Sequence, residues 1–213
     1  LCEKKGDKRC AVDNWLGAAV QWRTYQPWQT RALLEMGQFR MTETALELLA
    51  SRVENEPINT GFRVDLIKAL KNNGKTLKLQ EYFQKWEKEA GSDADWQEWL
   101  GRVYLRAGLF ERAARVLAKA HELRPQNARF RLNFADALLQ SGEYEDAMPL
   151  AKRAIMEGQQ RKPYALKKLL DIHLNACGRL GKKKVCEDEM KKMAASDLLP
   201  AAINESLKNV LAE

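Results

Sequence analysis

Three residues that bind metals or exchange electrons occur close together near the C-terminal end of the chain. His173 and Cys177 are four residues apart, which places them on one face of a helix. Cys186 begins the next amphipathic segment, and an antiparallel return brings it to the same place. Zinc takes four ligands, or three and a water molecule, and the sequence offers no obvious fourth ligand. We therefore predict no metal site and favour a Cys177–Cys186 disulfide, with zinc or two free buried thiols as the alternatives.

The cysteines also bear on the compartment. All four form close pairs, Cys2 with Cys10 and Cys177 with Cys186, and such spacing suits local disulfides formed in an oxidising compartment. The chain begins at Leu1 and lacks the roughly 18 to 20 uninterrupted apolar residues of a membrane span. We expect a bacterial periplasmic or membrane-tethered protein whose only membrane contact is an anchor upstream of Leu1. Four free thiols in the cytoplasm are the alternative.

The sequence contains no recognisable catalytic motif. The glycines are separated by whole helical segments, so none forms a phosphate-binding loop. No serine occupies a nucleophile elbow, and no carboxylate pair stands out from the helix surfaces. We therefore predict a protein that is not an enzyme and binds no cofactor.

Positive charge is concentrated near the C-terminal end. The chain has 36 Lys and Arg against 29 Asp and Glu, a net charge of +7. Residues 159–192 alone hold ten bases against four acids. A basic patch attracts acidic proteins, anionic membranes or nucleic acid, but it is also typical of an ordinary solvated helix face. This segment carries Tyr164 as its only aromatic residue, so it lacks a stacking platform, which argues against nucleic acid.

Helices account for the rest of the pattern. The chain is 45% hydrophobic and 31% charged, with only 12 Gly and 6 Pro in 213 residues, and no segment alternates like a strand. Amphipathic periodicity predicts helices at 11–25, 28–36, 39–54, 58–72, 75–89, 93–107, 110–123, 127–140, 143–157, 162–177, 182–195 and 200–212.

A repeat organises these helices. Glycines follow apolar helical runs at intervals of 37, 34, 34 and 36 residues, at Gly37, Gly74, Gly108, Gly142 and Gly178. Around them recurs an order of large apolar, small, large, Gly, aromatic and Ala residues. The small residues suit close helix crossings, and the glycines suit left-handed turns that end the first helix of each pair. In residues 94–127 the small positions are Gly101, Ala113 and Ala120, and Pro125 closes the unit.

This order resembles the tetratricopeptide repeat, a helix–turn–helix of 34 residues. Residues 94–127 and 128–161 match it best, whereas about 23–58, 60–92 and 162–195 match loosely. The resemblance implies an all-α, right-handed superhelical solenoid of about five hairpins in a single domain over 1–213, capped by the helix at 200–212. Such a cap covers the apolar end of a solenoid.

The resemblance also implies a binding surface. First helices of these repeats line a concave groove that binds peptides or protein segments. Carried onto this sequence, the predicted partner-binding residues are Lys68, Lys71, Trp99, Arg102, Arg106, Arg129 and Asn133. Asn133 matches one position of the carboxylate clamp that some members use on chaperones, but Glu98 stands where that clamp has a base. We therefore predict a non-catalytic scaffold for a partner with acidic or carboxylate groups, in a bacterial envelope assembly or biogenesis process.

A second resemblance stays open as the alternative. Residues 32–90 are similar to the helical regulatory domain of bacterial transcriptional activators, through Ala32, Leu33, Gly37, Leu46, Leu49, Pro57, Leu70, Gly74 and Tyr82. That resemblance implies a regulatory domain of a larger protein. Its DNA-binding helix-turn-helix is not visible in this sequence.

Overall fold

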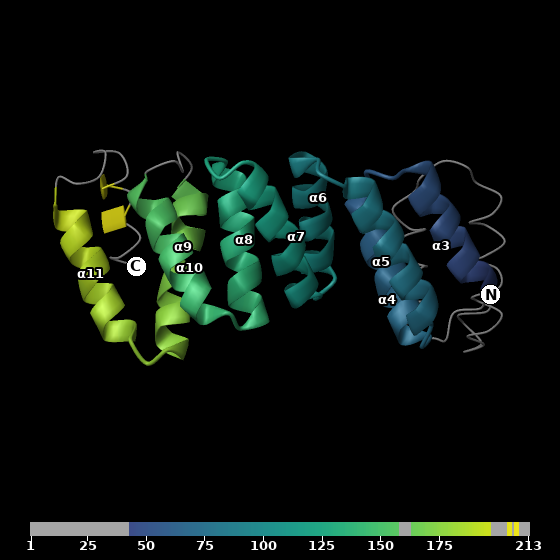
Figure 1. The fold of residues 1–213 in the computed structure, drawn as a ribbon. Helices are drawn as coiled ribbons and strands as arrows, with labels where there is room; N and C mark the ends of the chain where they lie inside the picture. The colour runs from purple at the N-terminus through teal and green to yellow at the C-terminus, as the bar shows by residue number, and fades with distance from the viewer. Residues whose placement is uncertain (1–42, 158–162, 197–203, 206, 209–213) are drawn as a thin grey trace, which may run out of the picture. The chain divides into compact units, whose positions relative to one another are not determined.

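The fold was analysed in a computed structural model, which describes residues 43–157, 163–196, 204–205 and 207–208. Those residues form helices and connecting turns, and they contain no strand (Figure 1). The helices are α3 (Glu43–Asn55), α4 (Thr60–Asn72), α5 (Thr76–Ala90), α6 (Ala94–Arg106), α7 (Phe110–Leu123), α8 (Ala128–Ser141), α9 (Tyr144–Met156), α10 (Pro163–Arg179) and α11 (Lys183–Ala195). The predicted all-α helical repeat is confirmed.

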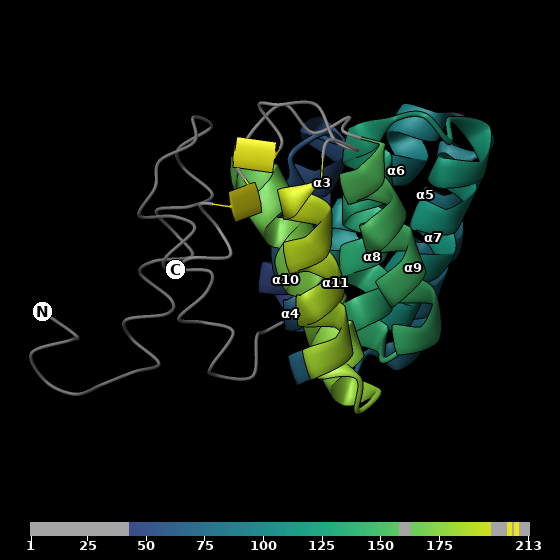
Figure 2. The ribbon, with the colours of Figure 1, turned by 90° about the vertical axis from the view of Figure 1, so that its left-hand side faces the viewer.

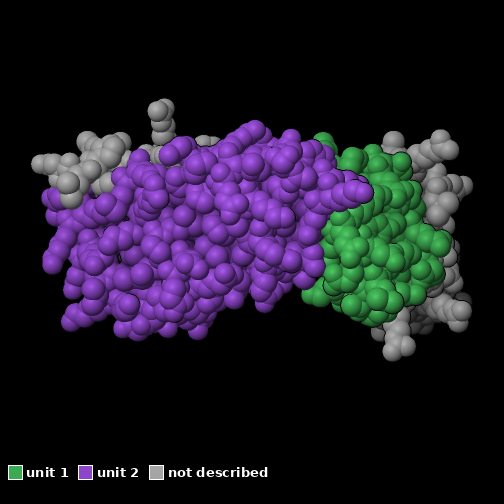
Figure 3. Space-filling model, in the orientation of Figure 1, with its two compact units in different colours: residues 1–86 green, residues 87–213 purple. Residues whose placement is uncertain are grey.

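The chain divides into two compact units, residues 1–86 and residues 87–213 (Figure 3). In the described part of the first unit, α3 packs on α4, and Leu46, Leu66 and Trp86 are buried in its core. The side chain of Asn59 caps α4 by accepting a hydrogen bond from the Gly61 amide at 3.1 Å. A cap of this kind satisfies a backbone donor that has no partner inside the helix.

The second unit is a row of stacked hairpins. Each helix from α6 to α11 packs against the next, and the alternate helices α6, α8 and α10 also contact one another (Figures 1 and 2). We call α6, α8 and α10 the inner row. Asp93 and Asn127 cap α6 and α8 with their side-chain oxygens, which fixes where these helices begin.

The best-matched repeat has the tight crossing that its small residues predict. Ala113 and Ala120 on α7 are fully buried. Gly101 on α6 faces Leu117 so closely that a methyl group added to it would lie 2.6 Å from Leu117 Cδ2. The reason for a glycine here is the lack of room for a side chain, and not its backbone conformation, which is that of an ordinary helix.

The turn glycines were predicted correctly at three positions and wrongly at one. Gly74, Gly108 and Gly142 follow their helices with positive φ, as a left-handed helix end requires. Gly178 does not, because α10 continues through it to Arg179, and Gly181 makes the left-handed turn instead, with φ of 70°. Gly37 lies outside the described residues.

Several predictions fall outside what the structure describes. These are the helices at 11–25 and 28–36, the Cys2–Cys10 pair and most of the capping helix at 200–212. The single continuous domain over 1–213 stays a prediction. Among the described helices, none has the length and apolar character needed to cross a bilayer.

Candidate functional site

The inner row carries a polar cluster centred on one buried carboxylate. Glu98 lies on α6 and its side chain is 1% exposed. The amide of Asn133 on α8 donates a hydrogen bond to Glu98 Oε1 at 2.7 Å, and Arg102 Nε lies 3.0 Å from the same oxygen. Arg129 on α8 places a guanidinium nitrogen 3.4 Å from Glu98 Oε2. One carboxylate therefore holds three of the predicted binding residues in place.

Two exposed neighbours extend this cluster. Asp95 on α6 pairs with Arg124 at 2.7 Å and with Arg129 at 3.4 Å. The side chains of Arg102 and Arg129 are 45% and 57% exposed, so both remain accessible to solvent while they are paired. We define the inner-row cluster as Asp95, Glu98, Trp99, Arg102, Arg106, Arg124, Arg129 and Asn133.

Arg106 and Trp99 complete the cluster on α6. Arg106 is exposed and has no ion pair among the described residues. Trp99 is half-buried and packs edge-on against Trp96, with ring centroids 5.1 Å apart. The helical spacing predicts that Trp99, Arg102 and Arg106 share one side of α6, which is an inner-row helix.

The other two predicted residues lie in the first unit. Lys68 and Lys71 are exposed on α4. Further along the inner row, Lys168 on α10 pairs with Asp136 on α8 at 2.6 Å. That pair links the last two inner-row helices in the way that Glu98 links the first two.

A hollow on the opposite side of these hairpins was not predicted. It has a volume of about 600 Å³ and lies between α7 and α9 over α8. Its walls combine small and apolar residues with charged ones, among them Ala118, His121, Phe134, Pro149 and Arg153. Partial burial holds the pKa of His121 below its usual value, and the nearby guanidinium groups of Arg131 and Arg153 lower it further. The alanines on α7 and the proline inside α9 were the only features of the sequence that could have indicated this hollow.

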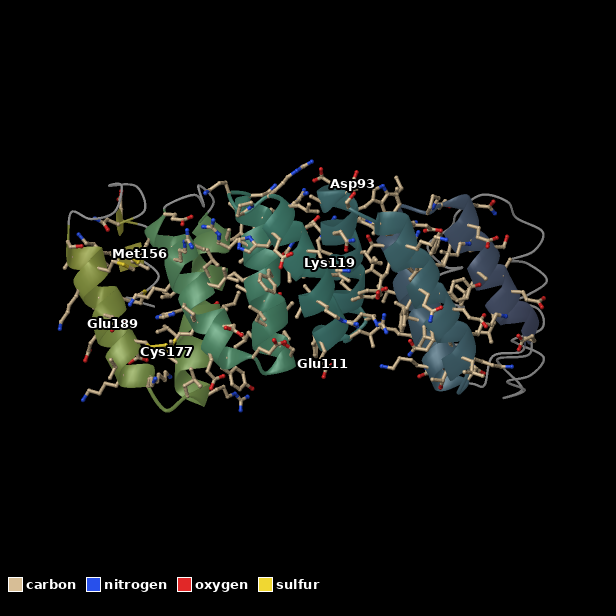
Figure 4. All side chains as sticks on the ribbon, in the orientation of Figure 1. Asp93, Glu111, Lys119, Met156, Cys177 and Glu189 are labelled. Carbon is tan, nitrogen blue, oxygen red and sulfur yellow. A yellow bond between two sulfur atoms is a disulfide. The ribbon has the colours of Figure 1, made fainter. Side chains whose placement is uncertain are left out.

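The third candidate is the histidine–cysteine cluster. Cys177 on α10 and Cys186 on α11 form a disulfide across the last hairpin, near the Cys177 label in Figure 4. His173 Nε2 lies 3.7 Å from Cys177 Sγ, and all three residues are buried. Burial lowers the pKa of His173 and so favours its neutral ring. The structure thus places His173, Cys177 and Cys186 close together, as their spacing in the sequence predicted. That the two cysteines are oxidised in the cell stays a prediction.

Comparison with known proteins decides what the hairpins are. A sequence model described as the tetratricopeptide repeat matches residues 104–170. Residues 104–170 of this chain carry tetratricopeptide repeats. The match runs through the second half of the 94–127 repeat, all of the 128–161 repeat and the start of the next, where the predicted register is strongest. Tetratricopeptide repeats serve as protein–protein interaction scaffolds, which is the coarse function of this chain.

Solved structures give weaker likenesses. The structure named MamA MSR-1 C2 is 14% identical, with a TM-score of 0.44, over 84% of this chain and 91% of that one. A tetratricopeptide repeat protein from Parabacteroides merdae is 18% identical, with a TM-score of 0.44, over 99% and 81%. A thermophilic tetratricopeptide repeat protein of Thermus thermophilus is 18% identical, with a TM-score of 0.39, over 95% and 100%. No curated protein sequence matches the chain.

Proposed function

We propose that the inner-row cluster binds an extended segment of a partner protein that carries carboxylate groups, and that the protein acts without catalysis. The observation that carries this proposal is the buried Glu98, which orients two guanidinium groups that remain open to solvent. Side chains that are already ordered lose less conformational entropy when they bind. The cluster is therefore prepared to receive a ligand before the ligand arrives.

The charge of the cluster sets the kind of ligand. Four guanidinium groups face two carboxylates, which leaves a net charge of +2 on the cluster. Guanidinium groups bind carboxylates through paired hydrogen bonds, and Arg106 has no competing acid among the described residues. Trp99 supplies an apolar contact beside these cations, a combination typical of binding hot spots. Lys68 and Lys71 belong to the same proposed set on the first unit.

The disulfide supports a location for this scaffold. A bond between Cys177 and Cys186 forms and persists in an oxidising compartment such as the bacterial periplasm. This bond supports our proposal that the scaffold acts in a bacterial envelope assembly or biogenesis process, periplasmic or tethered to the membrane.

Peptide selection tests the proposed binding surface without knowledge of the natural partner. A displayed library of random peptides is selected on the chain, and the affinities of the recovered peptides are measured by fluorescence anisotropy. We expect recovered peptides to be rich in Asp and Glu and to lose at least about tenfold in affinity when their carboxylates become amides. Neutral peptides that bind equally well would contradict the proposal.

A pair of matched charge reversals locates the site. Arg102→Glu with Arg106→Glu removes two cations from the cluster, whereas Lys182→Glu with Lys184→Glu makes the same change of charge at α11. All four residues are exposed, so circular dichroism should show both variants folded. Only the arginine variant should lose the acidic peptides. Equal losses would indicate non-specific attraction, and a loss confined to the lysine variant would place the site on α11.

A further inference from the structure

We propose that reducing the Cys177–Cys186 disulfide creates a buried site for one thiophilic metal ion, Zn²⁺ or Cu⁺, held by both thiolates and by His173 Nε2. The nitrogen and the two sulfurs all lie within 4.8 Å of one another. Imidazole and thiolate are the ligands that these two closed-shell ions prefer. The site is separate from the inner-row cluster and does not depend on peptide binding.

The orientation of His173 is the first observation behind this site. Its Nδ1 lies 3.0 Å from the main-chain carbonyl oxygen of Met148 on α9. A carbonyl oxygen only accepts hydrogen bonds, so Nδ1 carries the proton of the neutral ring and Nε2 presents a lone pair. Histidines that bind metals are commonly held in this way, with the second ring nitrogen donating to a carbonyl group.

The second observation is that the disulfide offers this lone pair no hydrogen, and no other described residue donates to it. Nε2 lies 3.7 Å from Cys177 Sγ, but a disulfide sulfur carries no hydrogen. His173 is 1% exposed, so bulk solvent does not reach this nitrogen. A buried acceptor of this kind is costly to leave unpaired. Either a thiol proton or a metal ion would satisfy it, and both require the disulfide to open.

The distances suit a metal ion once the sulfurs separate. An ion about 2.0 to 2.3 Å from each ligand atom holds those atoms about 3.3 to 3.9 Å apart. The separation of 3.7 Å between Nε2 and Cys177 Sγ already lies in that range. The two sulfurs must part, and Cys186 Sγ, which lies within 4.8 Å of Nε2, must settle at the ligand distance from the ion. Because α10 ends at Arg179 and α11 begins at Lys183, the short connection keeps the two helices close during this change.

The chemistry balances with a dithiol as reductant. The dithiol gives two electrons and two protons to the Cys177–Cys186 bond, which breaks into two thiols while the reductant closes its own disulfide. Metal binding then replaces the two thiol protons, which leave to solvent. Zn²⁺ with two thiolates is neutral and takes water as its fourth ligand, whereas Cu⁺ is satisfied by the three protein ligands with one net negative charge.

Metal titration tests the proposal on the full chain carrying Cys2→Ser and Cys10→Ser, so that only one cysteine pair remains. The chain is reduced with dithiothreitol under argon, freed of reductant, and titrated with Zn²⁺ or Cu⁺ against a coloured chelator. We expect one equivalent of at least one of these ions per reduced chain, and none per oxidised chain. Less than about 0.2 equivalents of both ions, or equal binding by the oxidised chain, would overturn the proposal.

The two histidines of the chain provide a matched comparison. His173→Ala should weaken metal binding by about 10-fold to 100-fold or more, whereas His121→Ala should leave it unchanged. Unchanged affinity in His173→Ala would show that the thiolates act alone. If that variant fails to fold, X-ray absorption of the loaded parent chain decides the question. Two sulfurs with one imidazole nitrogen support the site, and scattering without imidazole contradicts it.

Discussion

The contact between Gly101 and Leu117 predicts that adding one methyl group to α6 destabilises the second unit. Gly101→Ala gains about 1 kcal/mol of helix propensity. The added carbon, however, would lie 2.6 Å from Leu117 Cδ2, so the fully buried Leu117 would have to shift. Overpacking of this kind costs about 1 to 3 kcal/mol. The net expectation is a loss of up to about 2 kcal/mol in the free energy of unfolding.

Gly178 is the matched control. It also lies within a helix, but a methyl group added there meets only Lys183 Cδ, at 3.9 Å, which is an ordinary contact. Gly178→Ala should therefore gain up to about 1 kcal/mol, because the propensity term acts without a clash. The difference between the two variants isolates the cost of the clash at the α6–α7 crossing.

Urea unfolding followed by circular dichroism measures both free energies. Leu117→Ala provides a further check, because the smaller side chain makes room for the methyl group. In that background Gly101→Ala should no longer destabilise, and the two substitutions should show a coupling of about 1 to 3 kcal/mol. If Gly101→Ala instead stabilises the parent chain as much as Gly178→Ala does, the crossing is not tight and the repeat register is wrong.

Three further predictions concern titration, oxidation and the buried carboxylate. Because burial lowers the pKa of His121 in the folded chain, the unfolded chain binds the extra proton more readily. The stability due to this group should therefore be present above about pH 6.5 and be lost as the pH falls below that value. Urea unfolding at pH 7.5 and 5.5 should show a smaller loss of unfolding free energy in His121→Phe than in the parent chain. The disulfide closes a loop with a sequence separation of 9, so reducing it in metal-free buffer should cost about 2.7 kcal/mol in the free energy of unfolding. Thiol titration of denatured protein isolated from its native source should find Cys177 and Cys186 oxidised, and free thiols would contradict an oxidising compartment. Glu98→Ala should lower the free energy of unfolding by about 1 to 3 kcal/mol, since the Asn133 amide loses its acceptor. Glu98→Gln should lower it less in the same urea unfolding experiment, because an acceptor oxygen remains. Equal losses in the two variants would mean that this hydrogen bond does not stabilise the fold.

Local patterns were enough to predict the hairpins of the second unit. The small residues Gly101, Ala113 and Ala120 recur where helices cross, and their positions depend only on spacing along the chain. Gly178 was misassigned because a glycine within a helix and a glycine at its end look alike in sequence. The turn at Gly181 lies only three residues further on.

Contacts between repeats were harder to predict. The i,i+4 spacing of Glu98 and Arg102 is a visible signal for an ion pair, but the hydrogen bond from Asn133 comes from 35 residues away. That bond depends on how one inner-row helix lies beside the next, which the pattern of a single helix does not contain. The hollow at Ala118 and Pro149 was missed for the same reason, since its walls come from three helices, α7, α8 and α9.

Photo-crosslinking tests the central claim most directly. A selected acidic peptide carrying a photoreactive side chain is bound to the unmodified chain, irradiated, and its attachment sites are identified by mass spectrometry. The inner-row account predicts crosslinks in α6 and α8, within Ala94–Arg106 and Ala128–Ser141, and their disappearance in the Arg102→Glu, Arg106→Glu variant. Crosslinks confined to α11, or to the hollow between α7 and α9, would contradict it.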